Sequence, residues 1–393
     1  MQRRRRHLAS ECIFYISLIS IAIGTTGILL FAIYPLVLWL FAGSHKEKGR
    51  ITYIFPRISI IVVMRNAEKF VREKIWNCLT LDYPKDKVEI ICYCDGSTDK
   101  TEEILHEFKD NIKILVSKEH KGKAYGLNAS IQEARGDILV FSDVDARLER
   151  DALRRLLAHL HDESIGGVCG QRIIASKGSD LELSQRRYIS FDSAIKTLET
   201  RVLGSITSND GKLYAARKNL LKPIDPGSTD DFFVALSVVS SGARFIFEPR
   251  AFAYIPLPSR SLIHEIRRRR RIVTRSLRGL YLMKHLFNPR RYGLYSIGLF
   301  INKLIRRFLP IFFALVLMGV GILVTQAPVL VAITAALSGC GIVLVLLHTK
   351  LRNKTKKLIN ILVYFVAGLL GTALGLLDFL LGRQVTRWDP EAR

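Results

Sequence analysis

The stretch Val88-Glu-Ile-Ile-Cys-Tyr-Cys94, followed at once by Asp95-Gly-Ser-Thr-Asp99, decides the fold of this 393-residue chain. Its branched and aromatic side chains predict a short buried strand. Gly96 allows a tight turn after the strand, and Asp99 can cap a helix that begins there. A strand that turns directly into a helix is the repeating unit of an α/β protein. A simple turn with a helix N-cap is the alternative interpretation of the acidic residues.

The same order of strand and helix recurs on both sides of this stretch. Strands are predicted at 58–63, 88–94, 112–116 and 137–141, with helices at 70–79, 101–108 and 124–134. Such alternation with short links predicts an α/β fold with a mostly parallel sheet covered by helices on both faces. In sheets of this kind ligands bind beyond the carboxyl ends of the strands. Acidic residues at those ends are therefore candidates for a functional site.

A second acidic motif, Ser142-Asp143-Val-Asp145, follows the fourth predicted strand. Two carboxylates one residue apart at the end of a strand can share a divalent cation with a diphosphate. A solvated turn would give the same pattern, and the spacing also arises by chance. The motif gains weight only in combination with others.

The formal net charge of +24 first suggests a nucleic-acid-binding protein. The excess does not lie in the predicted α/β region, because residues 51–259 hold 30 basic and 29 acidic side chains. It lies beside long apolar runs, where basic residues face anionic lipid headgroups or follow the positive-inside rule. We therefore expect membrane lipids, and not nucleic acid, as partners of the basic segments.

Three runs without a formally charged side chain predict membrane-spanning helices, at 12–44, 308–349 and 358–377. At about 20 residues per crossing, the last two runs predict three C-terminal spans, with the longer run divided near Pro328. The first run is longer than one crossing needs and barely long enough for two. It predicts an uncleaved N-terminal anchor that is either a single span or a hairpin.

These patterns divide the chain into five regions. They are an N-terminal membrane anchor at 1–50, a cytosolic α/β domain at 51–258, amphipathic interfacial helices at 259–302, three transmembrane helices at 303–382 and a tail at 383–393. Five basic residues at 350–357 place the loop before the last span in the cytosol, and counting back places residues 51–300 there too. The arginines at 3–6 disagree with this orientation if the anchor spans once. The expected location is the plasma or inner membrane.

The six cysteines are scattered along the chain, which argues against a disulfide framework. Cys92 and Cys94 share one face of a predicted strand, but no second pair completes a zinc site. Free buried thiols in a reducing compartment are the expected state.

Six motifs, in their order and spacing, resemble those of the family 2 glycosyltransferases. They are Val62-Val-Met-Arg-Asn-Ala-Glu68, Asp95-Gly-Ser-Thr-Asp99, Gly122-Lys-Ala-Tyr-Gly-Leu-Asn128, Asp143-Val-Asp145, Gly211-Lys-Leu-Tyr-Ala-Ala-Arg217 and Thr229-Asp-Asp231. The resemblance covers residues 56–280, and the membrane layout is similar to that of the hyaluronan, chitin and cellulose synthases and of lipid-glycosylating members. It implies a GT-A fold and inverting transfer of a sugar from a nucleotide-diphosphate donor, UDP-linked, with Mg²⁺ or Mn²⁺.

The resemblance also implies roles for residues on the donor side. Arg65, Asn66 and Asp95 would line the nucleobase and ribose, and Lys123 would lie near the donor's nucleotide. Asp143 and Asp145 would form the pair that binds metal and diphosphate, with Asp145 as the direct metal ligand.

The Thr229-Asp230-Asp231 motif would supply the catalytic carboxylates, with Asp231 as the general base. A base is needed because a sugar hydroxyl is a poor nucleophile until its proton is accepted. A pair of acidic residues at a helix N-terminus, stabilised by the macrodipole, would look the same.

Residues 261–281 predict a basic amphipathic helix that contains five successive arginines. The resemblance implies that Arg271 grips the leaving diphosphate through its planar fork, with Arg268 near the donor. Docking to a membrane surface would also explain these arginines. The family's tryptophan after this arginine is replaced by Ile272, which puts processive chain synthesis in doubt.

Together the patterns predict a membrane-bound inverting glycosyltransferase that extends a polysaccharide or other glycan. Transfer of a single sugar to a membrane lipid is the alternative, and an inactive scaffold of a synthase complex is the non-enzymatic one. The intact Asp143, Asp145, Asp231 and Arg271 argue against a scaffold.

Overall fold

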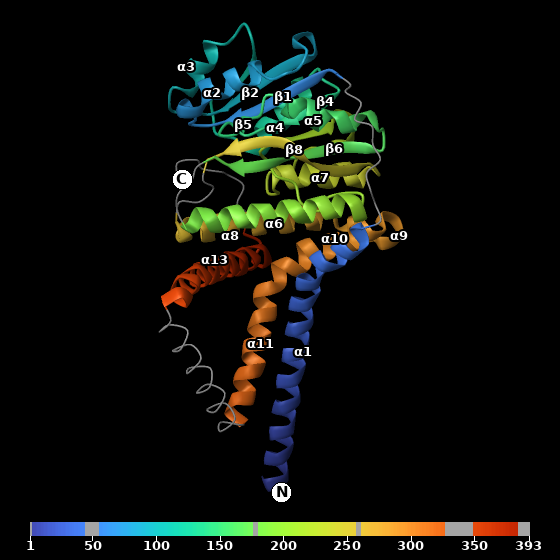
Figure 1. The fold of residues 1–393 in the computed structure, drawn as a ribbon, viewed down its shortest axis with the longest axis vertical. Helices are drawn as coiled ribbons and strands as arrows, with labels where there is room; N and C mark the ends of the chain where they lie inside the picture. Colours follow the sequence, from blue (N-terminus) through green and yellow to red (C-terminus); the bar gives the residue numbers. More distant parts are fainter. Residues whose placement is uncertain (1, 44–54, 176–179, 257–260, 327–348, 384–393) are drawn as a thin grey trace.

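The computed structural model describes residues 2–43, 55–175, 180–256, 261–326 and 349–383. A sheet with its covering helices forms one end of the molecule, and long helices extend from the opposite side of helices α6 (Asp180–Val202) and α8 (Leu262–Leu282) (Figure 1). The N-terminus lies at the far end of the longest helix. The six motifs quoted above all lie in the part that the sequence predicts as the α/β domain.

The sheet has eight strands in the order β3-β2-β1-β4-β7-β6-β8-β5. Their bounds are β1 (Ile58–Met64), β2 (Val88–Asp95), β3 (Lys113–Ser117), β4 (Ile138–Phe141), β5 (Arg147–Leu148), β6 (Ile165–Ile174), β7 (Tyr214–Arg217) and β8 (Arg244–Ile255). The first four strands pair in parallel, which confirms the prediction for them. Strand β7 runs antiparallel to both β4 and β6, and β5 runs antiparallel to β8, so the sheet is mixed.

Register brings the predicted motifs together at one edge. Val62 of β1 pairs with Cys92 of β2, and Ile61 pairs with Phe141 at the end of β4. The motifs that follow these three strands therefore lie side by side. The edge where the parallel strands end is where an α/β sheet binds its ligand.

Alternate residues of the central strand bury into two different cores. Ile60 and Val62 point to the face covered by α2 (Glu68–Leu79), α3 (Thr101–His106) and α5 (Ala152–Leu157). Ile61 and Val63 point to the face covered by α4 (Lys123–Glu133), α7 (Asp230–Ser240) and α8. Because both faces are covered, β1 is fully buried and reads as a continuous apolar run. Short 3₁₀ turns lie at Lys85–Lys87, Ala158–His161 and Lys218–Leu220.

The N-terminal run forms one continuous helix, α1 (Gln2–Ala42), with Pro35 inside it. The structure therefore has the single-span form of the anchor and not the hairpin. Three described helices are long and apolar enough to cross a membrane, over Glu11–Ala42, Leu294–Thr325 and Leu362–Leu380. The middle C-terminal span of the sequence prediction falls on 327–348, outside the described residues.

The interfacial region continues from α8 through short helices into the membrane part. These are η4 (Lys284–Phe287), α9 (Pro289–Tyr292), α10 (Leu294–Leu299) and the π-helix η5 (Phe300–Ile305), which runs on into α11 (Arg306–Gln326). The last helix is α13 (Thr349–Leu380). Of the predicted tail only Arg383 is described.

Glycines let these long helices approach closely. A Cβ atom on Gly24 of α1 would lie 2.5 Å from the carbonyl oxygen of Phe312 in α11. A Cβ atom on Gly375 of α13 would lie 2.5 Å from the carbonyl oxygen of Arg270 in α8. Small residues at helix contacts allow van der Waals packing in an apolar solvent that offers no hydrophobic drive for association.

Candidate active site

The loop after β1 is joined to the loop after β2 through Asn66. This residue has a positive φ of 46°, and its side-chain oxygen accepts a hydrogen bond of 2.8 Å from the Thr98 backbone amide. Its own backbone amide donates to the Ser97 hydroxyl at 3.1 Å. Arg65, the residue before it, is half-buried at the same edge. The two motifs that the sequence assigns to the nucleoside are therefore fixed relative to each other.

Asp95 is buried at the end of β2 and binds the loop that leads into α4. Its two oxygens accept hydrogen bonds from the Lys121 amide at 2.8 Å and the Gly122 amide at 2.9 Å, and one contacts His120 Nδ1 at 2.8 Å. Asp95 thus shapes the backbone that presents Lys123, the first residue of α4.

Lys123 joins the Asp143–Asp145 motif to the start of α7. Its Nζ lies 2.8 Å from Asp143 Oδ1 and 2.7 Å from Asp230 Oδ2. On the other side Lys212 Nζ lies 2.9 Å from Asp143 Oδ2 and 2.7 Å from Asp145 Oδ1. Three carboxylates therefore surround two ammonium groups at the end of β4. Lys212 belongs to a motif quoted above, but no role was predicted for it from the sequence.

The electrostatics of this cluster keep Asp143 ionised. Burial alone would raise the pKa of Asp143, but the ammonium groups of Lys123 and Lys212 hold it well below its ordinary value. Burial works against the charge of Lys123 in the same way, and Asp143 and Asp230 overcome it and raise its pKa. Both oxygens of the strand-end carboxylate are thus available to cationic partners at neutral pH.

Asp231 has different surroundings from its neighbour Asp230. Burial, followed by repulsion from Asp230, raises the pKa of Asp231 to about 7. Its side chain lies against Gly211, where a Cβ atom would be 3.1 Å from Oδ2. It also lines a small cavity of about 160 Å³ whose described lining contains neither Asp143 nor Asp145. A carboxylate with a pKa near 7 is suited to accept a proton at physiological pH.

A buried lysine that the sequence did not single out supports the Asp143–Asp145 turn. Lys74 of α2 is 3% exposed, and its Nζ donates to the Ser142 hydroxyl at 2.7 Å and the Ala146 carbonyl at 2.6 Å. These two residues flank the acidic pair, so the two hydrogen bonds from Lys74 hold the turn in place. The Ser142 hydroxyl in turn donates to the Lys212 carbonyl at 2.8 Å.

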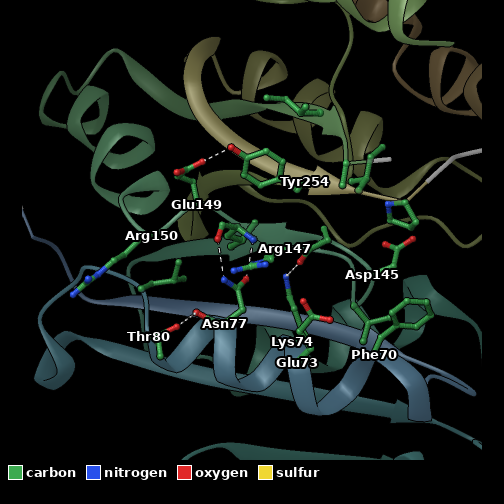
Figure 2. A pocket seen from close by; sticks show the side chains of 18 of the residues that line it. Phe70, Glu73, Lys74, Asn77, Thr80, Asp145, Arg147, Glu149, Arg150 and Tyr254 are labelled. Carbon is green, nitrogen blue, oxygen red and sulfur yellow. Dashed lines mark hydrogen bonds between the residues drawn. The ribbon is translucent and has the colours of Figure 1, made fainter. Parts of the chain in front are cut away.

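Lys74 and Asp145 line a large cavity of about 1390 Å³ (Figure 2). Side chains of α2, including Phe70 and Asn77, form one wall, and Tyr254 of β8 lies on the opposite side. The cavity is polar around Glu149, which accepts a 2.6 Å hydrogen bond from the Tyr254 hydroxyl. It gives Asp145 space on the side away from Lys212.

The five successive arginines at 267–271 of α8 have different surroundings. Arg268 and Arg269 pair with the buried Glu265 at 2.8 and 2.7 Å, and Arg270 pairs with Asp378 of α13. Arg268, Arg269 and Ile272 line the small cavity beside Asp231, whereas Arg271 is half-buried and is not among its described lining. Arg269 and Arg270 are thus both paired with carboxylates, and the Arg270 side chain remains 44% exposed.

The donor set at the end of β4 fits a hard divalent cation. Asp143 and Asp145 offer carboxylate oxygens only, and the contacts above show that these oxygens already attract cationic groups. Among the described residues no group of three or more metal-ligating side chains forms a complete cage. Mg²⁺ and Mn²⁺ are commonly held by one or two carboxylates with phosphate oxygens and water completing the shell.

The fold and the arrangement of this site resemble those of glycosyltransferases of the GT-A class. Residues 59–227 match the model of the family described as Glycosyl transferase family 2. This match agrees with the resemblance that the motifs in these residues predict.

Two known proteins resemble the chain over different shares of its length. A poly-β-1,6-N-acetyl-D-glucosamine synthase of Staphylococcus aureus is 28% identical over 209 residues, which cover 51% of this chain and 50% of its own. The chain thus spans about half the length of the curated relatives it matches. A mannosyltransferase of Pyrobaculum calidifontis, solved with GDP-mannose and Mn²⁺, superposes with a TM-score of 0.67. It is 21% identical and covers 90% of this chain and 99% of its own, which confirms the fold.

Proposed function

We propose that the protein is a membrane-bound inverting glycosyltransferase that moves a sugar from a nucleotide-diphosphate donor to a hydroxyl acceptor. The single observation that carries this proposal is the division at the start of α7. Asp230 faces the Lys123–Asp143 cluster at 2.7 Å, while the next residue, Asp231, lines a separate cavity. One helix N-terminus therefore separates a donor side, rich in charged groups that match a diphosphate, from a side where an acceptor can enter.

On the donor side the chain's own residues bind and orient the diphosphate. Lys123 and Lys212 supply positive charge within 3 Å of the acidic pair. A divalent cation held by Asp143 and Asp145 would neutralise the departing diphosphate, with Asp145 as the direct ligand. Arg65, Asn66 and the Asp95-shaped loop would hold the nucleoside, since they lie at the ends of β1 and β2. Arg271 would contact the leaving group, whereas Arg268, which the resemblance also assigns to the donor, lines the cavity beside Asp231.

On the acceptor side Asp231 acts as the general base. The acceptor hydroxyl oxygen forms a bond to the anomeric carbon while its proton passes to a carboxylate oxygen of Asp231. The bond between the anomeric carbon and the diphosphate oxygen breaks from the opposite face, and its electron pair leaves with the diphosphate. A single displacement of this kind inverts the anomeric centre.

The donor that we propose is a UDP-linked sugar, with Mg²⁺ or Mn²⁺ as the cation. The support for this donor is the synthase relative, whose name specifies a polymer of N-acetylglucosamine. We therefore favour UDP-N-acetylglucosamine over GDP-mannose. A growing polysaccharide is the matching acceptor, and a membrane lipid that receives one sugar is the alternative, favoured by Ile272 in place of the family's tryptophan.

We also propose that the protein resides in the plasma or inner membrane with residues 51–300 in the cytosol. Nucleotide sugars are cytosolic substrates, and the buried thiols of Cys78, Cys92, Cys94 and Cys169 suit a reducing compartment. The basic residues at 350–357 favour the same side by the positive-inside rule.

The test is release of nucleotide by the purified full-length protein in detergent. UDP-N-acetylglucosamine, UDP-glucose and GDP-mannose are each supplied with Mn²⁺ or Mg²⁺, with and without an extract of membrane lipids. We expect release of UDP from a UDP-sugar and stimulation by the extract. Release from GDP-mannose alone would overturn the donor assignment. No binding or turnover of any of the three donors would favour an inactive scaffold.

A further inference from the structure

The cavity beside Asp231 lies where the catalytic domain meets the membrane helices. Asp231 and Phe232 of α7 form one wall, Ile272 and Ser276 of α8 form another, and Thr372 of α13 closes it. Its volume of about 160 Å³ holds several water molecules, and hence a small polar group. Because the general base opens onto it, the occupant lies next to the acceptor hydroxyl.

This cavity is unusually positive for a buried space. Its lining contains six cationic side chains, namely Arg172, Arg268, Arg269, Lys303, Arg306 and Arg307, and three carboxylates, namely Asp192, Asp210 and Asp231. Two of the carboxylates already have cationic partners, because Lys196 pairs with Asp192 at 2.9 Å and contacts Asp210, and Arg172 lies 3.5 Å from Asp210. The pKa of about 7 leaves Asp231 partly protonated at neutral pH.

Three of the cations come from η5 and the start of α11, and their polar partners are neutral. Arg306 donates to the Tyr188 hydroxyl at 2.7 Å, and Arg307 donates to the Ser276 hydroxyl at 3.1 Å. Lys303 lies 5.1 Å from the centre of the Phe232 ring. In the part of the chain that the structure describes, none of the three forms an ion pair with a carboxylate.

These cations are buried at a position where burial is costly. Lys303 is 5% exposed and Arg307 is 8% exposed, and both belong to the candidate membrane span Leu294–Thr325. A buried charge without a counter-charge is strongly destabilising, and ionisable residues inside membrane segments mark substrate pathways. Guanidinium groups match phosphate oxygens in a planar, bidentate way. The cluster is therefore complementary to a phosphate at the depth of the lipid headgroups.

We propose that this cavity binds the phosphate of an anionic membrane lipid, and that this lipid is the acceptor on which transfer begins. The phosphate rests on Lys303, Arg306 and Arg307, and a hydroxyl of the same headgroup reaches Asp231. The hydroxyl oxygen takes the sugar and its proton goes to Asp231, while the lipid phosphate is unchanged and serves as the anchor. This inference rests on the proposed function and names the acceptor class of the same site.

The experiment compares three lipids as acceptors for the full-length wild-type protein. Phosphatidylcholine vesicles are doped with phosphatidylglycerol, which has a phosphate and free hydroxyls, with diacylglycerol, which has a hydroxyl only, or with phosphatidic acid, which has a phosphate only. The labelled donor is the one that releases nucleotide in the test above. We expect sugar transfer to phosphatidylglycerol, none to diacylglycerol, and competitive inhibition by phosphatidic acid. Equal transfer to diacylglycerol would overturn the inference and leave the proposed function intact.

Variants then locate the phosphate. Arg307→Gln and Lys303→Gln are expected to raise the KM for phosphatidylglycerol by about tenfold or more, because each loses a charge-assisted contact. The affinity for UDP is measured in parallel, and it is expected to change less than twofold. Arg290→Gln, on the exposed surface of α9, is the matched control and leaves both values unchanged. An equal loss of UDP affinity in the two cavity variants would assign the cations to the donor's diphosphate and overturn the inference.

Discussion

Asp231 and Asp230 are consecutive residues with different surroundings, and this difference is the basis of the separate roles that we propose for them. Asp230 is in contact with Lys123, whereas Asp231 is raised in pKa by burial and by Asp230 itself. Asp231→Asn is expected to lower turnover by about 10²–10⁴-fold while UDP binds with unchanged affinity, because the base faces the acceptor. Steady-state rates and calorimetric titration with UDP measure the two quantities. Loss of UDP binding in this variant would move Asp231 to the donor site.

The raised pKa of Asp231 also predicts the pH dependence. Below about pH 7 the carboxyl is protonated and cannot accept the acceptor proton, so kcat/KM should fall tenfold per pH unit on the acid side. The folded protein binds this proton more tightly than the unfolded chain does. Stability therefore declines as pH rises from about 4 towards 7, and Asp231→Asn should remove that decline. A rate profile that stays level through pH 7 would contradict this assignment.

The next prediction is that turnover depends on a divalent cation bound by Asp145. Asp145→Asn removes half of the acidic pair and should abolish turnover while the protein remains folded in the membrane. EDTA should abolish wild-type turnover, and Mn²⁺ or Mg²⁺ should restore it. Asp86→Asn, an exposed substitution in the turn Lys85–Lys87, is the matched control. Full activity in chelator would remove the metal from the mechanism.

At the scale of single residues the acidic positions are visible in the sequence, but their partners are not. Asp143, Asp145 and Asp231 stand out because carboxylates directly after strands or before a helix are visible in the chain. Lys74 could not be found, since a lysine in an amphipathic helix is usually exposed. Its burial depends on Ser142 and Ala146, which lie about 70 residues further along the chain.

At the scale of elements, close helix contacts depend on glycines. Gly375→Leu would drive a side chain into the backbone of α8 at Arg270, and Gly24→Leu would do the same at Phe312 of α11. Both variants should lower the Tm in detergent, because overpacking typically costs about 1–3 kcal/mol. Gly321→Leu is the matched control on α11, because a Cβ atom there meets nothing within 4 Å. Equal Tm values for all three variants would show that the helix pairs tolerate separation.

The elements themselves were predictable where local pattern decides them. The runs that form β1 to β4 are short, apolar and flanked by turns, and the structure confirms all four strands as parallel neighbours. The position of β7 between β4 and β6 was not predictable, because an antiparallel insertion depends on pairing across the sheet. The ion pair between Arg270 and Asp378 joins residues 108 positions apart, which helical spacing alone could not show.

At the scale of the whole molecule, the orientation in the membrane can be tested with one native thiol. Cys12 is exposed near the start of the α1 span, whereas the other described cysteines are buried. The span of 32 residues is longer than the roughly 20 that a bilayer needs, so Cys12 lies beyond the apolar core. With the catalytic domain in the cytosol, a membrane-impermeant maleimide should label Cys12 in intact cells.

Two variants control this measurement. Cys12→Ser should lose the label, and Glu103→Cys in the same background, on the exposed side of α3, should react only after permeabilisation. The reverse pattern would place the catalytic domain on the outer side. The sequence alone could not choose between a hairpin and a single span, because the arginines at 3–6 and the basic loop at 350–357 point in opposite directions.

The start of α7 joins the two substrates mechanically. In the function that we propose, two neighbouring carboxylates on one helical turn face different substrates, and the Asn209 side chain donates a 2.9 Å hydrogen bond to the Asp231 carbonyl. A small tilt of this helix cannot reposition one carboxylate without the other. Donor and acceptor affinities are therefore linked, and linkage is reciprocal. If bound nucleotide changes the affinity for the acceptor by some factor, bound acceptor changes the affinity for the nucleotide by the same factor.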